Sequence, residues 1–334
     1  MKKFIALLLA ALMVCGLAAC VHGVTPDATP EPTEEPIATA GPTAAPTEVP
    51  ATEVPATAAP VEHPACPLEE YPKVDGSTAN IPMAIALAQV VTGCTEDEAA
   101  ETIDFSTTDY AYDALAEGRA DLLLVYEASK PTKEKHRPET KFDMRPIGLD
   151  ALVFITNRNN PVESLTEAQI RGIFSGEITN WNEVGGLDQP IKAFQRPELS
   201  GSQTLMLDLV MKEVPMADPE SIVVSNTMSD VIRDIAAYDD SANAIGYSVY
   251  YYAQNMYNLP DLKFIAVEGT MPSYESINAG DYPYINPFYA ILPKTNVKPI
   301  AKNIADWLET EEGQYFVADC GYVPYMRGLD LTGK

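Results

Sequence analysis

The chain has 334 residues, of which 46% are hydrophobic, so it is long enough for one large domain or for two lobes around a sizeable core. It carries 22 basic and 48 acidic residues, and this net charge of −26 argues against a nucleic-acid binder or a polybasic membrane-surface protein. With three histidines, five cysteines and neither a CxxC nor an HExxH motif, we expect no metal site, and we expect no cofactor.

The N-terminus is typical of an export signal. Lys2 and Lys3 precede an apolar stretch at 4–14 that is too short to span a bilayer stably. The sequence LAAC at 17–20 follows, and small residues before a cysteine resemble the bacterial lipoprotein signal. We therefore expect residues 1–19 to be a cleaved signal peptide and Cys20 to be lipidated; the alternative is an ordinary secretory signal with a chance cysteine.

Residues 20–62 are predicted to be a disordered linker. Positions 21–62 hold nine Pro, eight Thr and six Glu, with no Lys or Arg, and TEVPA occurs twice in succession at 47–56. Without apolar periodicity this segment cannot bury a core, so we expect an extended tether to a folded domain at 63–334.

The folded part alternates predicted strands with predicted helices. The expected strands are 71–74, 103–105, 120–126, 144–148, 151–156, 191–195, 244–247, 262–267 and 288–292. The expected helices are 82–91, 110–116, 166–174, 202–211, 228–237, 300–308 and 313–320. This alternation predicts an α/β fold with a mostly parallel, doubly wound sheet. The basic run at 130–141 is expected to be a solvated loop rather than a docking patch.

The folded part retains three cysteines, Cys66, Cys94 and Cys320. In an exported protein a Cys66–Cys94 disulfide is one possibility, and the odd number leaves at least one thiol unpaired within a monomer.

Hydroxyl-bearing residues follow three of the expected strands, where helices are expected to begin. They are Ser77 and Thr78 after Gly76, then Ser106, Thr107 and Thr108, then Ser200 and Ser202 on either side of Gly201. Arg196 stands four residues before Ser200, and its planar guanidinium suits a tetrahedral oxyanion. Helix starts present unpaired N–H groups, and ligands of open α/β sheets bind at the carboxyl ends of strands. Each corner alone is explained by helix capping, but the three together predict an anion site.

Four stretches resemble the phosphate-binding proteins of ABC importers. They are SLTEAQIRGIFSGEITNWNEVGG at 164–186, Arg196-x3-Ser200-Gly201-Ser202, GYS at 246–248 and GYVP at 321–324. The resemblance covers about residues 69–327 and implies a two-lobed type II periplasmic-binding-protein fold with the ligand in the cleft. We expect the first lobe at about 67–152 and 283–330 and the second at about 153–282, with the chain leaving the first lobe near 150–157 and returning near 250–285.

The resemblance also assigns the binding residues. Phosphate is expected to contact Gly76, Ser77, Thr78, Ser106, Thr107, Thr108, Arg196, Ser200, Gly201 and Ser202. The family carries an Asp after the strand at 121–125 to accept the ligand's proton, but Tyr126 and Glu127 stand there. Glu127 is the first candidate for that acceptor and Asp109 the second; the alternative is that Glu127 is a solvated loop carboxylate. As an acceptor, Glu127 would discriminate against sulfate, so Glu127→Gln is expected to raise sulfate binding relative to phosphate.

These observations favour an extracytoplasmic, lipid-anchored, monomeric solute-binding protein that captures an oxyanion, phosphate first, and passes it to the permease subunits of an ABC importer. A second hypothesis is a binding-protein-like sensor or adhesin that no longer binds phosphate. A third, an exported hydrolase, is opposed by the lack of a GxSxG motif and by histidines in the linker, at its edge and in the basic run.

Overall fold

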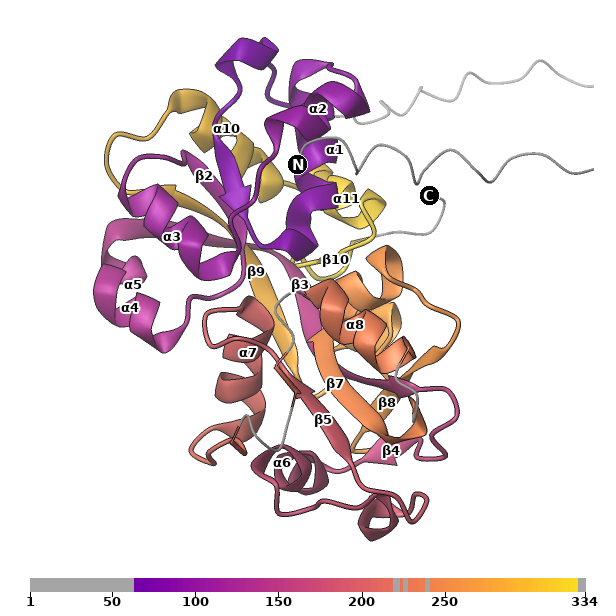
Figure 1. Ribbon diagram of the computed structural model, residues 1–334. Coiled ribbons are helices and arrows are strands. Elements are labelled where there is room, and N and C mark those ends of the chain that lie inside the picture. The colour runs from indigo at the N-terminus through magenta and orange to yellow at the C-terminus, as the bar shows by residue number, and fades with distance from the viewer. Residues whose placement is uncertain (1–62, 219–222, 225–227, 238–240, 330–334) are drawn as a thin grey trace, which may run out of the picture. The chain divides into compact units, whose positions relative to one another are not determined.

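The structure is a computed structural model that describes residues 63–218, 223–224, 228–237 and 241–329 (Figure 1). These ranges lie within one compact unit of the chain. The predictions for the signal peptide, Cys20 and the linker fall outside the described residues.

The first lobe is built on strands β1 (Val74–Gly76), β2 (Leu122–Val125), β9 (Ile285–Pro293) and the first part of β3 (Phe142–Asn157). They pair in the order β1-β2-β9-β3, and β10 (Val323–Pro324) adds to β3. The accompanying helices are α1 (Ile81–Thr92), α2 (Glu96–Thr102), α3 (Thr108–Ala116), α4 (Lys130–His136), α5 (Pro138–Lys141), α10 (Pro299–Leu308) and α11 (Glu311–Asp319).

The second lobe continues the same sheet from the other part of β3. Strands β7 (Ala244–Val249), β5 (Lys192–Gln195) and β6 (Val223–Val224) follow in that order, while β8 (Leu262–Val267) pairs with β3 and with β4 (Ser164–Leu165). Its helices are α6 (Glu167–Ser175), α7 (Gly201–Leu205) with a π-helical continuation (Met206–Met211), and α8 (Met228–Ala237). Helix α9 (Tyr274–Ala279) contacts both β3 and β10.

Strand β3 is the main connection between the lobes. Its residues up to Ala151 pair with β9, and from Leu152 onward they pair with β7 and β8. Figure 1 shows β3 and β9 running between the two groups of helices. The change of partner at Ala151 and Leu152 supports the predicted lobe boundary near 152, which remains a prediction.

Local sequence signals fix several elements where they were expected. Strand β2 reads Leu-Leu-Leu-Val, and all four residues are buried. Helix α6 begins at a capping box between Thr166 and Gln169 and ends at Gly176, whose φ of 82° is natural for glycine. Strands and helices such as β2 and α6 are determined by residues that are close together in the sequence. They position the loops that follow the strands.

The structure corrects three expectations about the elements. Of the nine strand pairings in the described residues, only four are parallel, because β3 and β9 run antiparallel to their neighbours; the sheet is mixed rather than mostly parallel. Residues 103–105 form a loop rather than a strand, and Phe105 packs over Gly76. The basic run at 130–141 is not a loop but forms α4 and α5.

No single helix in the described ranges is long and apolar enough to cross a membrane. One sharply bent pair, Thr78–Thr92 with Glu96–Thr102, passes the same test by length and composition only. Most of the apolar residues of α1 are buried in the core of the lobe.

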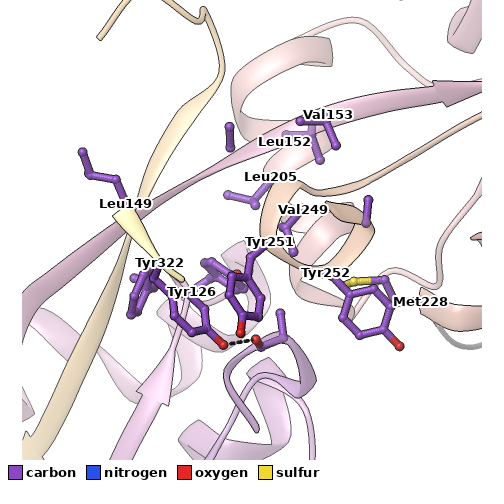
Figure 2. Packing of buried hydrophobic residues seen from close by; sticks show 14 of the residues in the cluster. Tyr126, Leu149, Leu152, Val153, Leu205, Met228, Val249, Tyr251, Tyr252 and Tyr322 are labelled. Atoms are coloured by element: carbon purple, nitrogen blue, oxygen red, sulfur yellow. Dashed lines mark hydrogen bonds between the residues drawn. The ribbon is translucent and has the colours of Figure 1, made fainter. Parts of the chain in front are cut away.

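A buried tyrosine cluster packs where β3 passes from one lobe to the other. Tyr251 of the second lobe stacks on Tyr322 of the first, with ring centroids 3.5 Å apart and planes 8° apart (Figure 2). Tyr126 lies in the same cluster (Figure 2). Its hydroxyl donates to Asp150 Oδ2 at 2.6 Å. These tyrosines are buried and join the lobes through packing.

Asp150 lies where β3 passes from one lobe to the other, and its titration tests the contacts at this point. Its carboxylate also accepts from the backbone N–H groups of Ala151 at 2.8 Å and Tyr251 at 3.1 Å. Burial raises the pKa of Asp150 from 3.8 to about 6, although these hydrogen bonds act to lower it.

Between pH 3.8 and about 6, the folded protein therefore holds a proton on Asp150 that the unfolded chain has already released. The stabilisation linked to this proton is complete below pH 3.8 and is lost as the pH rises through about 6; a shift of this size corresponds to about 3 kcal/mol. Asp150→Asn should remove this loss. Urea denaturation measures the free energy of unfolding of the variant and of the wild type. The difference between the two should shift in favour of the variant by most of that amount from pH 4 to pH 7.5. An equal difference at both pH values would contradict the assignment.

Candidate functional site

Loops from several parts of the chain meet around one cavity of about 340 Å³. Its lining comes from both lobes. The first lobe supplies Ser77, Thr78, Thr107, Thr108 and Tyr110, and the second supplies Arg196, Pro197, Glu198, Leu199, Ser200, Gly201 and Met228. The three hydroxyl-bearing corners predicted from the sequence therefore converge.

In the first lobe, the carboxylate of Asp75 ties the first corner to the second. Asp75 is 8% exposed, and its carboxylate accepts a hydrogen bond from the backbone N–H of Gly76 at 2.7 Å. It also accepts from the backbone N–H of Ser106 at 2.7 Å and from the Ser106 hydroxyl at 2.6 Å. Ser77 N donates to Leu124 O at 3.0 Å, which fixes the first corner at the end of β2. Asp75 is thus a positioning residue that sequence reasoning missed.

The second corner carries backbone strain at the cavity wall. Thr107, which precedes α3, has a φ of 92°, a conformation that is costly for a β-branched residue. Thr108 begins α3 and is 1% exposed. Strain of this kind persists only where the surrounding contacts impose it, and here it lies at the lining of the cavity.

In the second lobe, Arg196 follows β5 and is 8% exposed. Its backbone N–H donates to the Tyr247 hydroxyl at 3.1 Å and to Gln203 Oε1 at 3.3 Å, and Gln203 N donates to Ser200 Oγ at 3.3 Å. Burial lowers the pKa of the Arg196 guanidinium, but an arginine stays charged at neutral pH. The result is a buried cation beside hydroxyl groups.

The two lobes touch at this cavity. A Cβ atom built on Gly201 would lie 2.5 Å from Thr108 Oγ1 and 3.6 Å from Tyr126 Cδ2, so the second lobe approaches the first closely only because residue 201 is glycine. Farther out, Lys133 Nζ of α4 lies 3.6 Å from Asp208 Oδ2 of the second lobe.

Four of the predicted site residues do not line the cavity: Gly76, Ser106, Glu127 and Ser202. Gly76 packs against Leu124 O with no room for a side chain. Ser202 is fully buried, and its hydroxyl has no hydrogen-bond partner within the described residues.

The two candidate proton acceptors are both engaged elsewhere. Glu127 forms an ion pair with Lys133 at 2.8 Å and is about half exposed. Asp109 Oδ1 accepts from the backbone N–H and the hydroxyl of Ser129, both at 2.9 Å, and so holds the loop after β2. Its buried Oδ2 has no hydrogen-bond partner within the described residues, but Asp109 does not line the cavity. The lining residues in the described part of the chain include one carboxylate, Glu198, which the sequence analysis did not consider.

Five lining residues were not among the predicted site residues: Tyr110, Pro197, Glu198, Leu199 and Met228. Tyr110 and Glu198 are close neighbours of predicted site residues, so their positions on the corners were a usable signal. Met228 had none, since it comes from the start of α8, far along the chain.

The position of Glu127 leads to a prediction that differs from the one made from the resemblance. Because the carboxylate is paired with Lys133 outside the cavity, we expect Glu127→Gln to leave the ratio of phosphate to sulfate affinity unchanged. Calorimetric titration of both anions into the wild type and the variant measures this ratio. A selective rise in sulfate affinity would show that Glu127 turns toward the ligand.

The three described cysteines, Cys66, Cys94 and Cys320, are free thiols. The disulfide considered between the first two is therefore not formed in this structure.

The structure has two α/β lobes that are joined by crossing strands, and a buried arginine and hydroxyl groups lie in the cleft between them. This arrangement defines a two-lobed solute-binding fold. Residues 55–312 match the model of the PBP superfamily domain, and the chain belongs to this family. The two-lobed fold expected from the sequence is thereby confirmed.

Individual proteins are similar to parts of the chain. The chain is 28% identical to the phosphate-binding protein PstS of Bacillus subtilis over 179 residues, which are 53% of this chain and 55% of that protein. It is 28% identical to PstS of Borreliella burgdorferi over 205 residues, 59% of this chain and 69% of that protein. The alignment thus spans little more than half of the first relative's length.

A solved structure extends the likeness over more of the fold. A putative phosphate ABC transporter substrate-binding protein with bound phosphate from Clostridium perfringens superposes with a TM-score of 0.60 at 24% identity. The match covers 76% of this chain and 98% of that one. At this identity the likeness establishes the fold alone.

Proposed function

We propose that the chain is an extracytoplasmic solute-binding protein, not an enzyme, that captures a tetrahedral oxyanion between its lobes and delivers it to the permease of an ABC importer. Inorganic phosphate is the first candidate ligand, because relatives of the chain are named phosphate-binding proteins. The observation that carries the proposal is the convergence of Arg196 with the hydroxyl groups of three corners on one cavity.

The chemistry of the lining fits an oxyanion. Hydroxyls and backbone N–H groups at the starts of helices replace the hydration shell of the anion, and Arg196 supplies the compensating charge. The acidic surface does not oppose this, because carboxylates more than about 8–10 Å away are largely screened at physiological salt. Contact between the lobes at Gly201 and Thr108 removes water from the back of the cavity, which strengthens these interactions.

The same proposal extends to the predicted binding residues that do not line the cavity. Ser202 follows the hydroxyl–glycine turn, and its buried, unpartnered hydroxyl would find an acceptor in a bound anion. Gly76 and Ser106 support the first two corners through Asp75. Glu127 keeps the role of a selectivity residue only if it leaves Lys133.

Attachment to the membrane is part of the proposal. Lipidation at Cys20, followed by the extended linker, would hold a monomeric binding domain near its permease on the outer face of the cell membrane. Cys20→Ala should move the protein from the membrane fraction to the soluble exported fraction. Retention in the membrane fraction would contradict the lipid anchor.

Calorimetric titration with inorganic phosphate tests the binding function. We expect one site per chain with micromolar or tighter affinity. No binding of phosphate or sulfate would contradict the proposal and favour a sensor or adhesin, and steady release of phosphate from a phosphoester would favour a hydrolase.

A further inference from the structure

We propose that the cavity accepts a phosphate monoester or a phosphonate. Its phosphoryl end would occupy the oxyanion site, and its organic substituent would lie against Tyr110 and Leu199 at the mouth. This inference rests on the proposed oxyanion site and goes further by naming a larger class of ligand.

The size of the cavity is the first argument. A tetrahedral anion displaces on the order of three water molecules, or about 90 Å³ at roughly 30 Å³ per water. The cavity measures about 340 Å³ although the lobes already touch at Gly201 and Thr108. The cavity in this arrangement therefore has space well beyond that of the anion, of the size that small organic ligands fill.

The mouth of the cavity is apolar on both sides. Tyr110 of the first lobe is 53% exposed and Leu199 of the second is 38% exposed, two of only seven large hydrophobic residues that are exposed in the described chain. Pro197 and Met228 line the same cavity. A bare oxyanion gains nothing from such surfaces, whereas an organic substituent would bury them and would meet the face of an aromatic ring.

The positions of Glu127 and Asp109 agree with a ligand that is a phosphate monoester or a phosphonate. Hydrogen phosphate carries a proton that calls for an acceptor, but Glu127 is paired with Lys133, and Asp109, whose Oδ1 accepts from Ser129, does not line the cavity. The dianion of a monoester has no such proton, since its fourth oxygen is bonded to carbon. It can therefore use the hydroxyl and guanidinium donors and needs neither Glu127 nor Asp109 as a proton acceptor.

Calorimetric titration of the purified protein with inorganic phosphate, glycerol 3-phosphate and phenyl phosphate tests the inference. We expect at least one monoester to bind about tenfold more tightly than phosphate. Tyr110→Ala should reduce the ratio of monoester to phosphate affinity by about fivefold or more. Tyr325→Ala serves as the control because it removes a comparably exposed tyrosine that does not line the cavity, and it should leave the ratio unchanged.

The outcomes separate this inference from the proposed function. Tight phosphate binding with weaker or absent monoester binding would overturn the inference and leave the proposed function in place. Failure of all three anions to bind would overturn both. Monoester binding with an affinity ratio that is the same in Tyr110→Ala would overturn the placement of the substituent, and circular dichroism checks that the variant is folded.

Discussion

Arg196→Ala is expected to abolish measurable phosphate binding. The guanidinium is the cation that the described residues bring to the cavity lining, and it is 8% exposed. An anion bound there without it would be a buried charge lacking its partner, at a cost of about 3–5 kcal/mol, which corresponds to a loss of affinity of roughly 100-fold to several thousandfold. Calorimetric titration with inorganic phosphate measures the loss.

Arg196→Lys is the matched control for this experiment. It keeps the charge but replaces the planar fork with a single ammonium group, so we expect an intermediate loss of affinity. Thermal unfolding without ligand shows whether either variant disturbs the fold. Unchanged phosphate affinity in a folded Arg196→Ala protein would remove this residue from the site.

Gly201→Ala is expected to weaken phosphate binding by roughly fivefold to 100-fold. Its Cβ atom would lie 2.5 Å from Thr108 Oγ1, so the second lobe must move away from the first or the Thr108 side chain must leave its position. Overpacking at a tight contact costs about 1–3 kcal/mol. Here the cost destabilises the arrangement in which the lobes touch, so Gly201→Ala should lower the affinity for phosphate.

A double-mutant cycle with Thr108→Ala separates steric blocking from other effects. Removal of the threonine hydroxyl relieves the clash, so adding Gly201→Ala to Thr108→Ala should cost much less affinity than adding it to the wild type. Equal costs in the two backgrounds would show that the contact between residues 201 and 108 does not govern binding.

The corners of the site could be predicted from the sequence because each depends on local signals. Around Ser77 and Ser200 a buried strand, a turn with glycine beside hydroxyl residues and the start of a helix follow one another within a few residues. Around Thr108 three hydroxyl residues in succession mark the start of the helix although no strand precedes them, and the structure brings all three corners to one cavity. Arg196 was predictable in the same way, from its fixed spacing to Ser200.

The features that escaped prediction depend on contacts between distant segments. The sheet is mixed because β9, more than 100 residues after β3, pairs with it in the antiparallel direction. Glu127 does not line the cavity; it pairs with Lys133, which stands on a helix that was expected to be a loop and also pairs with Asp208 of the other lobe. No local pattern in the sequence encodes these contacts.

The buried carboxylates show the same limit. Asp75 joins two corners that are 31 positions apart, and Asp150 links Tyr126 of one lobe to the backbone of Tyr251 in the other. Each acts by positioning loops or lobes. Their roles became visible only when the partners were brought together by the fold.

A crystal structure of the protein grown with inorganic phosphate tests the central claim most directly. The account predicts tetrahedral density in the cavity, within hydrogen-bonding distance of the Arg196 guanidinium and of hydroxyl groups from both Thr108 and Ser200. Phosphate bound elsewhere, or bound in the cavity through only one lobe, would contradict it.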